Sequence, residues 1–169
     1  MADKLKYIID TSSLTQAYRT YYSFDIAPSF WNFLETQFQN GIITSNDKVF
    51  DEIKLGKDKL YDWMKVQNIK TMLINTKSEI GLIAHYAHLM QWAEKQSQYK
   101  PAAKERFAAF ENADPWIIAC GLQHELTIVS MEVAAPLSKS AIKIPDVCNA
   151  FSINHIDTFS FLNEIGFKM

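Results

Sequence analysis

Four acidic residues stand at positions from which they could act together as a metal site. Asp10 closes the apolar run Tyr7-Ile-Ile, and Glu132 follows a second such run by two residues. Asp114 precedes one predicted helix, and Glu52 lies one and a half turns into another. Carboxylates gathered at one place repel one another unless a cation lies between them. Because their hard oxygen atoms suit Mg²⁺ or Mn²⁺, the pattern predicts a divalent-metal centre.

Each of these acids also has an interpretation without a metal. Asp10 could cap a helix, although the Thr-Ser-Ser that follows it already offers three capping side chains. Asp114, directly before a proline, is a good N-cap by itself. Glu52 has a second acid beside it, and such adjacent pairs are more often solvated than catalytic. Glu132 alone indicates little, so the metal centre depends on a fold that brings the four together.

Short apolar runs predict the strands that such a fold needs. They lie at residues 4–10, 42–44 and 126–130, with shorter candidates at 141–144 and 151–154. Helical spacing and caps predict helices at 14–22, 28–40, 46–55, 58–67, 80–96, 101–110, 115–124 and 157–166. Strands separated by helices are typical of parallel sheets, in which ligands bind beyond the carboxyl ends of the strands. We therefore predict an α/β fold with a central, mostly parallel sheet of about four to five strands flanked by helices.

Local patterns set three further boundaries. Thr76 and Glu79 match a capping box, in which a hydroxyl and a carboxylate satisfy two backbone amides at a helix start. Asp114-Pro115 predicts another helix start. The stretch 131–140 is predicted to be a loop.

Length and composition limit the class of protein. The chain has 169 residues, 48% hydrophobic and 21% charged, which fits one domain over residues 1–169 and excludes wholesale disorder. No apolar run reaches the ~18 residues of a membrane span, and the first residues lack the apolar stretch of a signal peptide. Cys120 and Cys148 form no C-x-x-C pair, so neither a disulfide scaffold nor a zinc ribbon is expected. We expect a soluble, cytoplasmic protein.

The charge distribution is uneven along the chain. The net charge of −2 argues against a simple basic nucleic-acid binder. Residues 48–106, however, hold 11 basic and 7 acidic residues, against 6 and 12 in the remainder. A basic middle suits an anionic substrate brought to a carboxylate site, but on charge alone a solvated helical face is the favoured interpretation.

Motifs along the whole chain carry a resemblance to a known family. They are Tyr7-Ile-Ile-Asp-Thr-Ser12, Gly41-Ile-Ile-Thr-Ser45, Val49-Phe-Asp-Glu-Ile53, Ala113-Asp-Pro-Trp-Ile-Ile-Ala119, Ile128-Val-Ser-Met-Glu132 and Lys143-Ile-Pro-Asp-Val-Cys148, with Trp31 and Trp63 between them. In their order and spacing they resemble the bacterial PIN-like family catalogued as DUF4411. The resemblance implies a three-layer PIN-like fold and a metal-dependent nuclease.

The resemblance also implies roles for single residues. The family's catalytic, metal-binding acids correspond to Asp10, Glu52, Asp114 and Glu132, which would hold one or two Mg²⁺ or Mn²⁺ ions. Its supporting hydroxyls correspond to Ser12 and Ser130. Glu132 departs from the pattern, since many PIN domains have the shorter Asp there. Asp146 is a candidate fifth acid, for which a turn or capping role is an equal alternative.

The function implied by the resemblance is hydrolysis of RNA phosphodiester bonds, leaving a 5′-phosphate and a 3′-hydroxyl. PIN domains of this size are commonly toxins of bacterial toxin–antitoxin modules, so the expected partners are RNA, a protein antitoxin and a second copy of the chain, with no membrane. Two alternatives stay open. One is a non-catalytic PIN-like binding or assembly module, and the other is a structure-specific DNA nuclease.

Three other groups of residues have more ordinary interpretations. His85 and His88 lie three apart on a predicted helix but lack an H-E-x-x-H pattern, so packing is favoured over metal binding. Cys148 has no nucleophile signature around it and is predicted to be a buried thiol. The tryptophans are predicted core anchors, although one at the surface could stack a base. They are Trp31, Trp63, Trp92 and Trp116.

Overall fold

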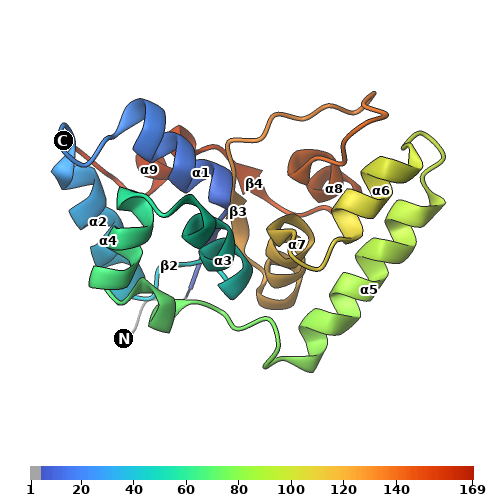
Figure 1. Cartoon of the computed structure of the whole chain (residues 1–169), viewed down its shortest axis with the longest axis horizontal. Helices are drawn as coiled ribbons and strands as arrows, with labels where there is room; N and C mark the ends of the chain where they lie inside the picture. Colours follow the sequence, from blue (N-terminus) through green and yellow to red (C-terminus); the bar gives the residue numbers. More distant parts are fainter. Residues whose placement is uncertain (1–4) are drawn as a thin grey trace.

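A computed structural model describes residues 5–169 and shows an α/β fold built on a four-stranded sheet (Figure 1). The strands are β1 (Tyr7–Ile9), β2 (Ile43–Thr44), β3 (Thr127–Val129) and β4 (His155–Ile156), in the order β2-β1-β3-β4. Every neighbouring pair is parallel. The carboxyl ends of all four strands therefore lie at one edge, as predicted.

Nine α-helices surround the sheet in residues 5–169. They are α1 (Thr11–Gln16), α2 (Pro28–Gln39), α3 (Asp47–Gly56), α4 (Lys59–Val66), α5 (Ile80–Lys95), α6 (Pro101–Ala108), α7 (Ala113–His124), α8 (Ile144–Phe151) and α9 (Thr158–Glu164). Two short turns complete the chain, a π-helical one at Ala17–Tyr21 and a 3₁₀ one at Ile69–Met72. The predicted helix at 14–22 is thus split, because α1 widens into the π turn.

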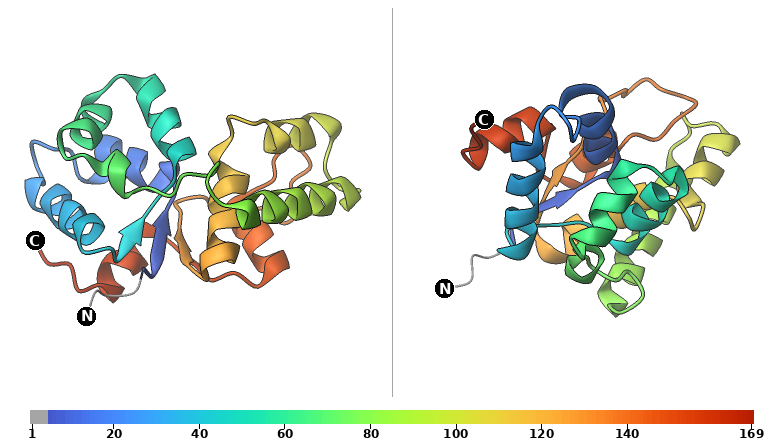
Figure 2. Two further views of the ribbon diagram at one scale, coloured as in Figure 1. Left: turned by 90° about the horizontal axis from the view of Figure 1, so that it is seen from below. Right: turned by 60° about the vertical axis from the view of Figure 1, so that its left-hand side comes forward.

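Alternation along the strands places helices on both faces of the sheet. Ile9 of β1 and Val129 of β3 face a space lined by residues of α1, α2 and α9. Ile128 points to the opposite face, where it lies close to Gly121 of α7. Helices α5 and α6 lie beyond α7 on that side, at the right of Figure 1 and in the left view of Figure 2. The order helix, sheet, helix gives three layers and confirms the predicted fold class.

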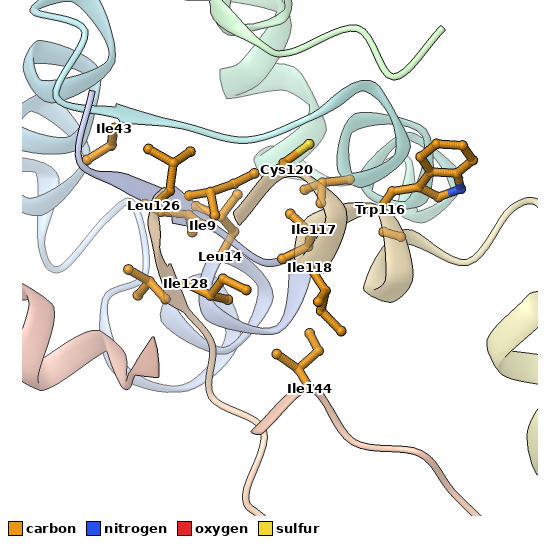
Figure 3. Packing of buried hydrophobic residues seen from close by; sticks show 14 of the residues in the cluster. Ile9, Leu14, Ile43, Trp116, Ile117, Ile118, Cys120, Leu126, Ile128 and Ile144 are labelled. Atoms are coloured by element: carbon orange, nitrogen blue, oxygen red, sulfur yellow. The ribbon is translucent and has the colours of Figure 1, made fainter. Parts of the chain in front are cut away.

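Helix α7 is the central helix of this core. It is apolar almost all round, and its residues from Pro115 to Gly121 are buried. Figure 3 shows Ile117 and Ile118 of α7 among buried residues of the strands and Ile144 at the start of α8. A Cβ at Gly121 would come within 3.1 Å of the Ile128 side chain, so α7 and β3 pack closely at this glycine. The tight packing fixes the start of α7, where Asp114 lies.

Two predicted strands are wrong. Residues 141–144 form no strand, and Ile144 begins α8, with Pro145 in its first turn. Proline fits a helix start because that position needs no backbone N–H, whereas it would remove a hydrogen bond from a sheet. Residues 151–154 lie at the end of α8 and in the turn after it, where Ser152 has φ 56°. The strand itself begins directly after this range, at β4.

The predicted capping box is also wrong. Glu79 is the N-cap residue of α5 but forms no side-chain cap, and Thr76 does not bond to the helix. Instead, the backbone N–H and hydroxyl of Thr76 donate to the two carboxylate oxygens of Asp47, at 2.9 and 3.1 Å. A stronger acceptor at the start of α3 has taken the donors of Thr76.

The remaining side-chain predictions concern the core. Trp31, Trp63 and Trp116 are buried anchors, and Trp92 is half-buried against Phe151. Both cysteines are buried free thiols, and burial raises the pKa of Cys148 to about 12, as expected of a structural residue.

The loop predicted at 131–140 is free of helix and strand. Within residues 5–169 we find no helix with the length and hydrophobicity of a membrane span.

Candidate active site

Asp10 lies at the centre of the carboxyl edge of the sheet. It follows β1, and its backbone N–H donates to Val129 O of β3 at 2.9 Å. Its side chain is 2% exposed and caps α1. Oδ2 accepts hydrogen bonds from the hydroxyls of Ser12 at 2.6 Å and Ser130 at 3.1 Å. Oδ1 is buried without a hydrogen-bond partner in the part of the chain that the structure describes.

The hydroxyls of Ser12 and Ser130 hold this carboxylate in place. Their Oγ atoms lie 3.2 Å apart, and both donate to the same oxygen of Asp10. Each hydroxyl also accepts a backbone N–H from the segment after β3, Met131 to Ser12 and Glu132 to Ser130, at 3.0 and 3.1 Å. The two serines therefore join the ends of β1 and β3 and leave Oδ1 of Asp10 without a hydrogen bond from residues 5–169.

Asp114 lies in the first turn of α7, and the prediction that it caps this helix is wrong. The N-cap is Asn112, whose Oδ1 accepts the backbone N–H of Asp114 at 3.0 Å. The helix starts two residues earlier than predicted, which leaves the Asp114 carboxylate with no capping duty. The capping interpretation of this acid is therefore ruled out, while its place in the first turn of α7 still suits a carboxylate.

Replacing Asn112 with Ala tests this assignment. We expect the free energy of unfolding to fall by about 0.5–2 kcal/mol, the usual effect of losing an N-cap. The loss should show as a lower midpoint in urea unfolding. Asn40→Ala is the control, because Asn40 is exposed at the end of α2, and it should change stability by less than about 0.5 kcal/mol. An unchanged midpoint for Asn112→Ala would mean that the Asn112 side chain does not stabilise the start of α7.

Electrostatics join Asp114 to the other three acids. Burial raises the pKa of Asp114 well above its usual range, and the charges of Asp10, Glu132 and Glu52 raise it further. Burial also raises the pKa of Asp10 to about 6, against the lowering effect of the Ser12 hydrogen bond and with a further rise from Glu132. The charges of the other three predicted acids thus all reach Asp114, and these four residues are called the acidic cluster below.

Glu52 forms hydrogen bonds to the starts of two helices, α1 and α7. Its Oε2 accepts the hydroxyl of Thr11 in α1 at 2.6 Å, and its Oε1 accepts the backbone N–H of Ala113 in α7 at 2.9 Å. Both bonds lie on helix N-termini, where a carboxylate is favoured by the helix dipole. Glu52 therefore positions the neighbours of Asp10 and Asp114 as well as adding its own charge.

Glu132 is held by the start of α8. Its Oε2 accepts the backbone N–H of Ile144 at 2.8 Å, and its Oε1 lies 3.5 Å from Nζ of Lys143. The side chain that is one methylene longer than aspartate is thus fixed at its far end. Asp146, the candidate fifth acid, instead accepts the Ala135 N–H on both oxygens, at 3.0 and 3.1 Å, and so pins the loop after β3.

The donor set fits a hard divalent cation. Asp10 presents a buried oxygen without a partner, and buried polar atoms normally have one. As they stand, no three His, Cys, Asp or Glu side chains between residues 5 and 169 are close enough to enclose an ion. Carboxylates with like charge are expected to keep apart until a cation draws them in. The side chain of Asp10 accepts all its hydrogen bonds from residues 5–169 on Oδ2, so Oδ1 is the atom that remains open to a cation.

Comparison with known families gives one match, to the family described as "Domain of unknown function (DUF4411)", over residues 7–169. The chain belongs to the DUF4411 family. No curated protein and no solved structure matches the chain significantly. The match confirms the DUF4411 part of the resemblance, and membership of DUF4411 names no reaction.

Two site residues of this DUF4411 domain were not predicted. Thr11 is the hydrogen-bond donor to Glu52, and Lys143 is the cation beside Glu132. The only signals in the sequence were their places, directly after Asp10 and directly before the apolar start of α8. Neither position indicates a contact across more than ten residues of chain, which only the fold brings about.

Proposed function

We propose that this DUF4411 domain is a metal-dependent endoribonuclease of the PIN-like type. The observation that carries the proposal is the buried, unpartnered carboxylate oxygen of Asp10, together with the charges of Asp10, Glu52 and Glu132 that act on Asp114. A binding module has no need for buried carboxylates that raise one another's pKa, since such a cluster destabilises the fold without a cation. A metal-dependent phosphodiester nuclease does need such a cluster of carboxylates, because they hold its cation.

The four acids take different parts in this proposal. Asp10 is the central ligand, because two serine hydroxyls leave one oxygen free. Asp114, on which the charge of Asp10 acts, is the second ligand, and Glu132 and Glu52 complete the set directly or through water. When bound, Mg²⁺ or Mn²⁺ supplies an activated water and a counter-charge for the scissile phosphate. The residues themselves hold the geometry, since helices α1, α7 and α8 each fix one carboxylate through a backbone N–H.

The biological role that we propose is that of a toxin in a bacterial toxin–antitoxin module, acting in the cytoplasm. Its proposed partners are the RNA substrate, a protein antitoxin and a second copy of the chain. Support for a protein partner comes from the loop after β3, where Val133 and Leu137 are 79% and 90% exposed. Such exposed apolar side chains, on the loop that follows Glu132, offer an antitoxin a place to bind.

Cleavage of end-labelled RNA and single-stranded DNA tests the proposal. We expect purified protein to cut RNA with Mn²⁺ or Mg²⁺, to leave 5′-phosphates, and to stop cutting when EDTA is added. Cleavage of DNA alone would replace the proposal with the DNA nuclease.

Melting of the same purified protein with and without Mn²⁺ distinguishes a nuclease from a non-catalytic binding module. If neither nucleic acid is cut, a melting temperature that does not respond to Mn²⁺ would favour the module, because a ligand that binds only the folded state must raise the temperature.

A further inference from the structure

Lys143 places a positive charge inside the acidic cluster. Its Nζ lies 3.5 Å from Glu132 Oε1, and its charge lowers the pKa of Asp114 against the effect of the other acids. The Lys143 and Glu132 side chains are 37% and 19% exposed, so the pair is only partly screened by water. Among the ion pairs between residues 5 and 169, this one alone involves a candidate metal ligand.

The backbone around Lys143 is fixed. Lys143 is the N-cap residue of α8, and the next residue, Ile144, is fully buried and donates its N–H to Glu132 Oε2 at 2.8 Å. Two consecutive residues thus engage both oxygens of Glu132. Asp146, in the first turn of the same helix, holds the loop after β3. These contacts hold the backbone of Lys143 beside Glu132, so rotation of the Lys143 side chain is the simplest way for its ammonium group to move away.

We propose that Lys143 is the built-in counter-ion of the acidic cluster and competes with a divalent cation for Glu132. The inference rests on the proposed function, since it assumes a metal site. An ammonium and a divalent cation at one carboxylate repel each other, so binding of the metal must weaken the Lys143–Glu132 contact. Lys143 would then set how much free metal the protein needs, and would neutralise part of the cluster when metal is scarce.

Replacement of Lys143 by Met, which is similar in length but uncharged, tests the competition. Free Mn²⁺ is measured by electron paramagnetic resonance during titration of the purified protein. We expect Lys143→Met to bind Mn²⁺ about two- to fivefold more tightly than wild type, as suits a partly exposed ion pair. Lys139→Met is the matched control, because Lys139 is exposed on the same loop and pairs with no acid between residues 5 and 169. It should leave the affinity unchanged.

Thermal melting in EDTA gives a readout that needs neither metal nor RNA. Without its counter-ion, Lys143→Met should melt below wild type and Lys139→Met, whereas Lys143→Arg, which keeps the charge, should melt close to wild type. If Lys143→Met does not fold, Lys143→Gln takes its place in both measurements.

The outcomes separate this inference from the proposed function. Mn²⁺ binding with equal affinity in wild type and Lys143→Met would overturn the counter-ion and leave the metal site standing. Mn²⁺ binding by Lys143→Met alone would support the counter-ion and overturn the nuclease for the natural chain. No Mn²⁺ binding by either protein would overturn both.

Discussion

Asp10→Asn is expected to abolish RNA cleavage while making the metal-free protein more stable. The substitution removes the charge of the central ligand, so we expect the rate to fall by at least about 10³-fold, equivalent to roughly 4 kcal/mol of activation free energy. Loss of activity through unfolding would look the same in a cleavage assay. The opposite sign of the stability change distinguishes the two causes.

The stability gain follows from the surroundings of Asp10. An Asn oxygen can take the place of Oδ2, so that the hydrogen bonds from Ser12 and Ser130 and the cap of α1 are kept. The Asn amide group then stands where Oδ1 has no partner, and it can donate toward the neighbouring acids. Removal of a buried charge should raise stability by about 1–3 kcal/mol at pH 7.5, or about 2–4 °C per kcal/mol.

The measurements are cleavage in Mn²⁺ and melting by circular dichroism in EDTA. Asp51→Asn is the matched control, because Asp51 is exposed beside Glu52 and carries the same charge. It should keep activity and change the melting temperature little. A folded Asp10→Asn protein with wild-type cleavage would remove Asp10 from the site.

The parts of the site that could be predicted are those set by strands. Asp10 and Glu132 follow apolar runs, and β1 and β3 are parallel neighbours, so the two acids meet at one edge. The hydroxyls of Ser12 and Ser130 were predicted from the resemblance, and the structure places both on Asp10. Residues that follow two adjacent parallel strands lie close together, so their places in the sequence are enough to predict that they meet.

The parts that could not be predicted depend on competition between polar groups. Asp114 and Asn112 are both good caps, and the sequence does not say which of them the start of α7 will use. Thr76 was predicted to cap the helix at 80–96, and for the same reason it instead donates its hydrogen bonds to Asp47. Ala141 to Ile144 was predicted as a strand from its apolar residues, and the burial of Ile144 with Pro145 made a helix start instead. Because α8 starts here in place of a strand, Lys143 becomes its N-cap residue and lies beside Glu132.

The second large effect that we expect is a dependence of stability on pH. The pKa of Asp10 is raised to about 6 in the folded protein, so the folded state binds a proton that the unfolded state has lost between about pH 4 and pH 6. Stability contributed by this group is therefore present at low pH and is lost as the pH rises through 6. A shift of about two pKa units corresponds to on the order of 3 kcal/mol.

The comparison of wild type with Asp10→Asn isolates this contribution from all other titrating groups. In EDTA, the variant should exceed wild type in stability most above pH 7. The difference should shrink as the pH falls and approach zero only below about pH 4, where Asp10 is protonated in the unfolded state as well. Urea unfolding at several pH values measures it. Saturating Mn²⁺ should reverse the order at pH 7.5, because the cation favours the ionised carboxylate and binds the folded state. A difference that stays constant with pH would mean that Asp10 is not a protonated acid of a shared cluster.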